Sequence, residues 1–159
     1  MPTFHEMPVV ITEMLIRKPV EEVFEAFVDP AITSRFWFTR GSGRLEAGAT
    51  VRWEWEMYAA AAEIGVLELV PNEKIVIDFG YRVEWTFAPQ EAGTFVTIAS
   101  SGFAGDGDEI VRQAVDATEG FTIVLCGLKA YLEHGIALNL VGDKAPHAHV
   151  SKQGHTREK

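Results

Sequence analysis

Residues 106–135 read DGDEIVRQAVDATEGFTIVLCGLKAYLEHG, and this stretch decides the fold. It predicts one long helix over residues 107–132, because Asp106 and Glu109 have the spacing of a capping box and Gly135 suits the left-handed end of a helix. One face of this helix is apolar at helical spacing, with Ile110, Ala114, Ala117, Phe121, Leu125, Leu128 and Leu132. A helix of roughly 40 Å with one apolar face needs a broad apolar surface to lie on.

The rest of the chain predicts that surface as a β-sheet. Residues 51–57 alternate strictly between apolar and polar and form the clearest strand. Two helices, at 20–28 and 31–36, separate the first strand from the later ones, with Pro19 at a helix start. The short connections favour antiparallel neighbours, so we expect an α+β fold in which one curved antiparallel sheet grips the C-terminal helix. The predicted strands are 9–16, 44–45, 51–57, 63–70, 75–79, 83–87 and 94–103.

Length and composition predict a single domain over residues 1–142, followed by a polar tail at 143–159. Hydrophobic residues make up 47% of the chain, enough for a core without metals or disulfides. The single Cys126 cannot form an internal disulfide, and no signal peptide or membrane-spanning run is evident, so we expect a cytoplasmic protein. A net charge of −9 argues against binding nucleic acid or anionic lipid surfaces.

Four pieces of the sequence carry a family likeness in their order and spacing. They are residues 17–24 (RKPVEEVF), the Asp29-Pro30 step leading to Phe36-Trp37, residues 83–103 with Gly93-Thr94 and Ser101-Gly102-Phe103, and Gly120-Phe121 with residues 128–135. The chain therefore resembles the SRPBCC (START-like, helix-grip) superfamily, and within it the bacterial single-domain branch related to the activator of Hsp90 ATPase. The resemblance covers roughly residues 7–140 and implies a helix-grip fold.

This resemblance also carries expectations about function. In the wider superfamily the space between sheet and helix is often a cavity for lipids, sterols, hormones or polyketides, and some relatives are cyclases or aromatases. Two departures stand out. Family members usually carry Gly-Trp where this chain has Gly120-Phe121, which keeps the aromatic ring but lacks the indole N–H. The eukaryotic activator has a separate N-terminal domain for its chaperone role, and nothing in this sequence corresponds to it.

Aromatic side chains on the predicted strands are the main candidates for a ligand site. Trp53 and Trp55 belong to one strand and Trp85 to another, and these indoles either fill the core or line a pocket. Pockets lined by aromatic groups with few polar ones are typical of small-molecule sites. We expect Trp37 to lie near the entrance. The full candidate lining is Trp37, Trp53, Trp55, Glu63, Leu67, Trp85, Val96 and Phe121.

Charged and metal-ligating residues offer few candidates for a catalytic or metal site. Arg52, Glu54 and Glu56 are predicted on the solvated face. Glu63 shares a face with Leu67, so it is the candidate for an inward carboxylate with a raised pKa; the alternative places it at an exposed strand entrance. No catalytic or phosphate-binding motif is recognisable, no cofactor is expected, and the pair His147 and His149 lacks the further ligands of a metal site.

Three functions remain open at this point. The favoured one is non-catalytic binding of an apolar or amphipathic small molecule, such as a lipid, between sheet and helix. The second is a cyclase- or hydrolase-like enzyme using Glu63 or Tyr58. The third, from the resemblance alone, is a co-chaperone-type interaction module. An enclosed cavity with at most one titratable group would favour binding, several converging titratable groups an enzyme, and a filled core with exposed aromatic residues an interaction module.

The second half of the long helix also suggests an assembly surface. Ile123, Val124 and Tyr131 lie on its far or flanking sides, where a helix covering only a sheet would be polar. Gly120 and Gly127 each cost about 1 kcal/mol relative to Ala in a helix interior, which close approach of another backbone would explain. The N-terminal helices or a partner subunit would supply that backbone, and the second alternative predicts a homodimer through the second half of the helix.

Overall fold

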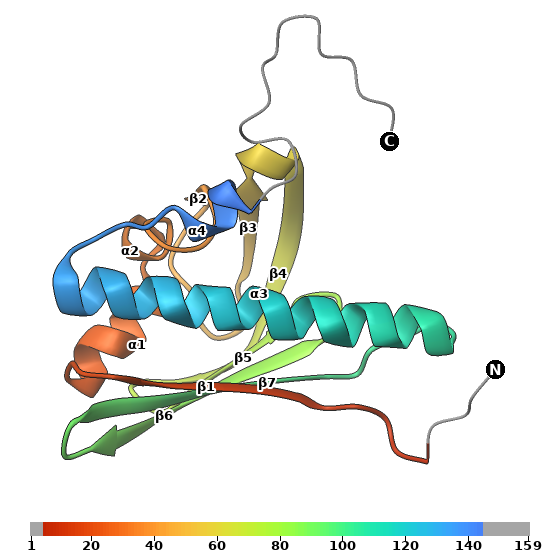
Figure 1. The fold of residues 1–159 in the computed structure, drawn as a ribbon, viewed down its shortest axis with the longest axis horizontal. Coiled ribbons are helices and arrows are strands. Elements are labelled where there is room, and N and C mark those ends of the chain that lie inside the picture. Colours follow the sequence, from red (N-terminus) through yellow and green to blue (C-terminus); the bar gives the residue numbers. More distant parts are fainter. Residues whose placement is uncertain (1–4, 145–159) are drawn as a thin grey trace, which may run out of the picture.

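The computed structural model describes residues 5–144, which form one curved β-sheet wrapped around one long helix (Figure 1). Seven antiparallel strands follow the order β1-β7-β6-β5-β4-β3-β2, so the first strand pairs with the last. The α+β helix-grip prediction is confirmed. The strands are β1 (Val10–Ile16), β2 (Arg40–Gly41), β3 (Thr50–Trp55), β4 (Ala60–Val70), β5 (Lys74–Asp78), β6 (Arg82–Gln90) and β7 (Gly93–Ser101); the helices are α1 (Val20–Val28), α2 (Pro30–Thr33), the 3₁₀ turn η1 (Glu56–Tyr58), α3 (Gly107–His134) and α4 (Leu140–Asp143).

Helix α3 begins and ends at the residues that the sequence indicates. The Asp106 carboxylate accepts a hydrogen bond from the Glu109 N–H, and the Glu109 carboxylate accepts one from the Asp106 N–H, which completes the capping box. Gly135 ends the helix with φ of 69°, in the left-handed region. Over its 28 residues the helix crosses the sheet and runs alongside β1 (Figure 1).

Several elements shift by a few residues at their ends, and two further differences from the prediction change the local structure. The short strand expected at Arg44-Leu45 is wrong. Besides β4, the strand that pairs with β3 is β2 (Arg40–Gly41). Leu45 is buried in a loop, where its N–H donates to the carbonyl oxygen of Val28. The strand expected to reach Met57 ends at Trp55, because η1 turns the chain there and Ala59 takes a left-handed conformation before β4. Both differences reshape the end of the sheet that lies nearest α4.

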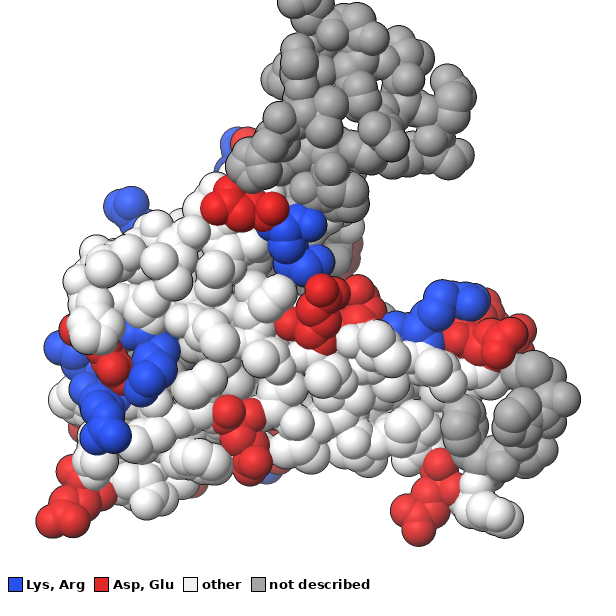
Figure 2. All heavy atoms as spheres, viewed as in Figure 1, with Lys and Arg blue, Asp and Glu red and all other residues white. Residues whose placement is uncertain are grey.

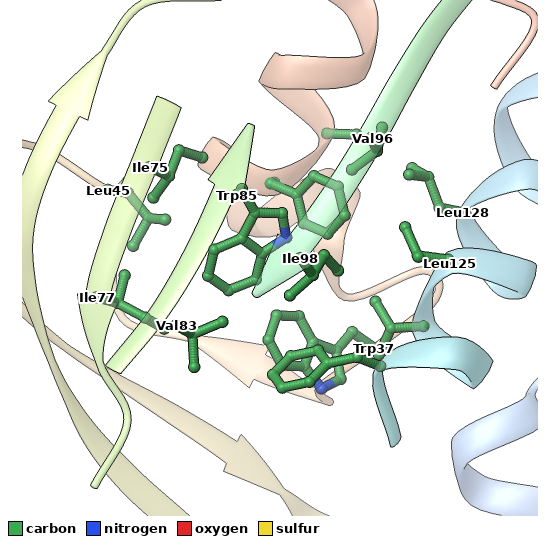
Figure 3. Packing of buried hydrophobic residues seen from close by; sticks show 14 of the residues in the cluster. Trp37, Leu45, Ile75, Ile77, Val83, Trp85, Val96, Ile98, Leu125 and Leu128 are labelled. Carbon is green, nitrogen blue, oxygen red and sulfur yellow. The ribbon is translucent and has the colours of Figure 1, made fainter. Parts of the chain in front are cut away.

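The core fills the space between the inner sheet face and the helices. In Figure 3, Trp85 and Ile98 lie between the strands and Leu125 and Leu128 of α3, and Ile75 lies beside Leu45. Helix α1 adds its apolar face to this core, as its spacing predicts, with Val23, Phe24, Phe27 and Val28 buried.

A clamp of charged groups joins the end of β1 to the last turns of α3. The Lys129 ammonium donates to the carbonyl oxygen of Leu15 (2.8 Å) and to the Glu133 carboxylate (2.7 Å), which also accepts the Arg17 N–H (2.7 Å). Burial alone would raise the pKa of Glu133, but the hydrogen bonds from Lys129 and Arg17 and the lysine charge hold that pKa below its ordinary value.

Replacing Glu133 by Gln is expected to lower the free energy of unfolding at pH 7 by about 1–2 kcal/mol, because charge-assisted hydrogen bonds are lost. A carboxylate with a lowered folded-state pKa stabilises above its unfolded pKa of 4.5. The difference from wild type should therefore shrink as the pH falls below 4.5 and through the folded-state pKa. Urea unfolding at several pH values measures it. Glu91→Gln, at an exposed turn, is the control, and an equal loss in both variants would contradict the clamp.

Candidate functional site

An open groove of about 360 Å³ lies beside the core, between α3, α4 and the end of the sheet formed by β3, η1 and β4. Figure 2 shows acidic and basic groups meeting where α4 approaches α3, on a face with large uncharged areas. The groove is lined by Trp37, Trp55, Tyr58, Ala60, Phe79, Asp116, Gly120, Phe121, Ile123, Val124, Val141 and Lys144.

Helix α3 supplies one wall through a second stripe of residues beside its sheet-facing one. Asp116, Gly120, Ile123 and Val124 recur at i, i+4, i+7 and i+8, so they share a face. A Cβ placed on Gly120 would meet no atom within 4 Å. The close backbone approach expected at Gly120 is therefore wrong, and this glycine instead leaves open space along the groove.

Gly127, further along the same helix, does lie close to the backbone of another segment of the chain. A Cβ there would lie 3.2 Å from the Phe36 Cβ and 3.3 Å from the Phe36 carbonyl oxygen. Leu140 of α4 is the next neighbour, at 3.7 Å. At Gly127 the second side of α3 is thus covered by other segments of the same chain, so the close approach at this glycine does not itself require a partner subunit.

The floor of the groove is aromatic. The Trp37 ring centroid lies 6.2 Å from those of Trp55 and Phe79 and 5.7 Å from that of Phe121. Trp55 and Phe79 are 6.0 Å apart. Phe79 follows β5 and continues its inward alternation after Ile75 and Ile77, a signal present in the sequence that the candidate lining omits.

The centre of the expected cavity, by contrast, is filled. Trp53 and Trp85 are at most 2% exposed, and the space among them, Phe27 and Leu45 does not admit a water molecule. Val96 is fully buried in the same core. The candidate residues thus divide: Trp37, Trp55 and Phe121 reach the groove, whereas Trp53, Trp85 and Val96 pack the core behind it.

Glu63 and Leu67 lie on the outer face of the sheet, so their predicted inward orientation is wrong and the exposed alternative for Glu63 is confirmed. Leu67 is 58% exposed, and the Glu63 carboxylate lies 3.3 Å from Arg52 on the outer face. Ile64 and Val66 occupy the inner face instead. The pairing of β4 with β5 shifts register between Val66 and Glu68, so a bulge changes the alternation partway along the strand. As predicted, Arg52, Glu54 and Glu56 lie on the outer face. They form ion pairs there, and none of the three lines the groove.

Among residues 5–144, three titratable groups line the groove: Tyr58, Asp116 and Lys144. The Lys144 ammonium lies 3.5 Å from the Glu119 carboxylate. Burial lowers the pKa of Lys144, but its interactions with Tyr58 and Glu119 outweigh burial and raise it, so the amine stays protonated at neutral pH. Burial, and next the charge of Asp116, raise the pKa of nearby Tyr81 to about 12, so this phenol stays neutral.

Other ligand classes find no support within residues 5–144. No group of three or more His, Cys, Asp and Glu side chains there could hold a metal ion. His147 and His149 lie outside the described residues, as does the predicted tail from residue 145 onward. Among the described helices, none has the length and apolar character to cross a bilayer.

The comparisons with known proteins fit this architecture. The model of the family described as "Activator of Hsp90 ATPase homolog 1-like protein" matches residues 17–133. The chain belongs to this family. A search of curated proteins finds no significant match.

Solved structures of similar proteins cover most of the chain. Protein SSP2350 from Staphylococcus saprophyticus is 37% identical with a TM-score of 0.75, and the alignment covers 82% of this chain and 96% of that one. The Aha1 dimer from Colwellia psychrerythraea is 19% identical with a TM-score of 0.69, covering 81% and 98%. DynU16, from the dynemicin biosynthetic locus, is 23% identical with a TM-score of 0.70, covering 81% of this chain and 48% of that one. The Colwellia protein and DynU16 are similar to this chain in fold alone.

Proposed function

We propose that this family member binds an apolar or amphipathic small molecule, without catalysis, in the groove beside α3. The observation that carries the proposal is the aromatic floor of an otherwise open 360 Å³ space next to a closed core. Small-molecule sites are typically concave, mostly apolar and about 300–1,000 Å³ in volume. Burial of ligand surface against Trp37, Trp55, Phe79 and Phe121 would drive affinity, and the polar groups at the mouth would orient the ligand.

Native mass spectrometry of protein purified from its own host tests this proposal. We expect a co-purifying small molecule whose removal lowers the melting temperature, because a ligand that binds only the folded state stabilises it. Its return should restore that temperature and quench tryptophan fluorescence, since Trp37 and Trp55 line the groove. Repeated absence of any adduct, with no thermal shift from a panel of lipids and aromatic compounds, would contradict the proposal.

A cyclase- or hydrolase-like enzyme is the second candidate, favoured by one observation. Tyr58, Asp116 and Lys144 gather at the groove, more titratable groups than a simple binder requires. They stand at its mouth, however, and the raised pKa of Lys144 does not suit a general base. Incubating the recovered ligand with fresh protein separates the two functions: an enzyme changes its mass or chromatographic position, and a binder returns it unaltered.

The co-chaperone alternative predicted aromatic residues exposed outside the core. Among the described residues, Tyr58 is the one large aromatic side chain that is exposed, and it borders the groove. This favours small-molecule binding over an interaction module.

The cytoplasmic location stays a prediction that draws on the unpaired thiol of Cys126.

Homodimerisation is a separate part of the proposal and draws on the Colwellia neighbour, which is described as a dimer. We place the contact on the first half of α3, because Val111 and Val115 share one face and are 48% and 63% exposed. In the second half, the chain itself covers α3 at Gly127. Sedimentation across a concentration range should show a dimer that Val115→Glu weakens at least about tenfold, since a charge would be buried. A wild-type monomer at all concentrations would contradict this.

A further inference from the structure

The charges around the groove do not balance. Lys144 is held by Glu119 and Tyr58. Asp116 lines the same groove but forms no hydrogen bond or ion pair with any residue between 5 and 144. The local excess is therefore negative, and the net charge of the whole chain, −9, has the same sign.

The aromatic floor adds to this negative character. Aromatic rings carry partial negative charge on their faces and attract cations placed over them. Trp37, Trp55, Phe79 and Phe121 lie within 5.7–6.3 Å of their neighbours in this cluster, so a ligand in the groove contacts several rings together. An aromatic surface beside an unpaired carboxylate is a combination that suits organic cations.

We propose that the groove selects an amphipathic organic cation: an aromatic or otherwise apolar body that carries an amine or quaternary ammonium group. The body lies on the aromatic floor, and the cationic group pairs with Asp116. This inference rests on the proposed function, because it names the chemical class of the ligand for the same groove. Asp116 repels anionic ligands, and Lys144 attracts them only weakly because Glu119 already faces its ammonium.

Three ligands with one ring system test the inference: 1-naphthylmethylamine, protonated at pH 7, the neutral 1-naphthylmethanol, and the anion 1-naphthoate. Isothermal titration of the full chain should give measurable binding of the alcohol. The ammonium should bind at least about fivefold more tightly than the alcohol, from its contacts with the rings and Asp116, and the carboxylate more weakly than either.

Asp116→Asn should remove the preference for the ammonium while changing the affinity for the alcohol less than about twofold, because the amide keeps the size of the side chain. Glu91→Gln removes the same charge at an exposed turn away from the groove and should leave the preference intact, which controls for net charge. Circular dichroism verifies that both variants fold.

The outcomes of these titrations distinguish a failure of the organic-cation inference from a failure of the proposed function. If the alcohol binds but the ammonium gains nothing, or if the preference survives in Asp116→Asn, the inference is overturned and the proposed function stands. Tightest binding by naphthoate would also overturn it and would assign Lys144 as the polar anchor. If none of the three ligands binds, the proposed groove function fails, and the inference fails with it.

Discussion

Gly93→Ala is expected to lower the free energy of unfolding by about 3–5 kcal/mol, the sum of backbone strain and overpacking. Gly93 opens β7 with φ of 152°, which L side chains rarely adopt. A Cβ there would lie 2.2 Å from the Ile16 carbonyl oxygen and 2.7 Å from the Arg17 Cα. Because these atoms are backbone, no side-chain rotation relieves the clash. The end of β1 would have to move away from β7, and with it the clamp between Arg17 and Glu133.

Gly43→Ala is the matched control for this change. A Cβ at Gly43 meets nothing within 4 Å, and its φ is not positive. Its stability should stay level or rise by up to about 1 kcal/mol, because alanine restricts the unfolded chain. Urea unfolding followed by tryptophan fluorescence measures both variants, and similar stabilities for the two would refute the close packing of β1 on β7.

Gly120→Leu is expected to weaken ligand binding at least about tenfold while raising the free energy of unfolding by about 0.5–1 kcal/mol. The two effects have opposite signs for separate reasons. Leucine is a much better helix former than glycine, and a Cβ at Gly120 meets no atom within 4 Å. The rest of the leucine side chain, however, occupies the groove that the ligand needs.

Thr122→Leu is the matched control for this change, since it adds an apolar side chain at an exposed position of α3 outside the groove. It should leave affinity unchanged. Titration calorimetry with 1-naphthylmethanol and thermal unfolding give the two readouts. A Gly120→Leu variant that binds as tightly as wild type would mean that the ligand lies elsewhere.

The sequence carries enough information for the fold because its strongest signals are local. The capping box at Asp106, the left-handed Gly135 and the apolar stripe between them act within single turns of α3. The alternation along a strand is a weaker signal for which side chains face the core. Simple alternation puts Leu67, and Glu63 with it, on the inner face, but a bulge near Leu67 changes the alternation and no residue there marks it. Leu45 is buried in a loop, where its N–H donates to the carbonyl oxygen of the distant Val28, and not in a strand.

The groove could be predicted only in part for the same reason. Trp37, Trp55 and Phe121 were candidates because large aromatic residues are conspicuous in a sequence. Val141 and Lys144 reach the groove only because the chain folds back along α3 after Gly135, which no local pattern encodes (Figure 1). The spacing of Asp116, Gly120, Ile123 and Val124 shows in the sequence that they share a helix face. The sequence does not show that this face borders a groove, because the opposite wall comes from distant segments.

The central claim is that ligands occupy the groove and not the packed centre of the sheet. Methyl-labelled protein titrated with 1-naphthylmethanol and followed by NMR tests this directly. The account predicts saturable shifts at Ile123, Val124 and Val141, which line the groove, and little change at the fully buried Ile64, Ile77 and Ile98. Saturable shifts confined to the three core isoleucines, or no shifts at any ligand concentration, would contradict it.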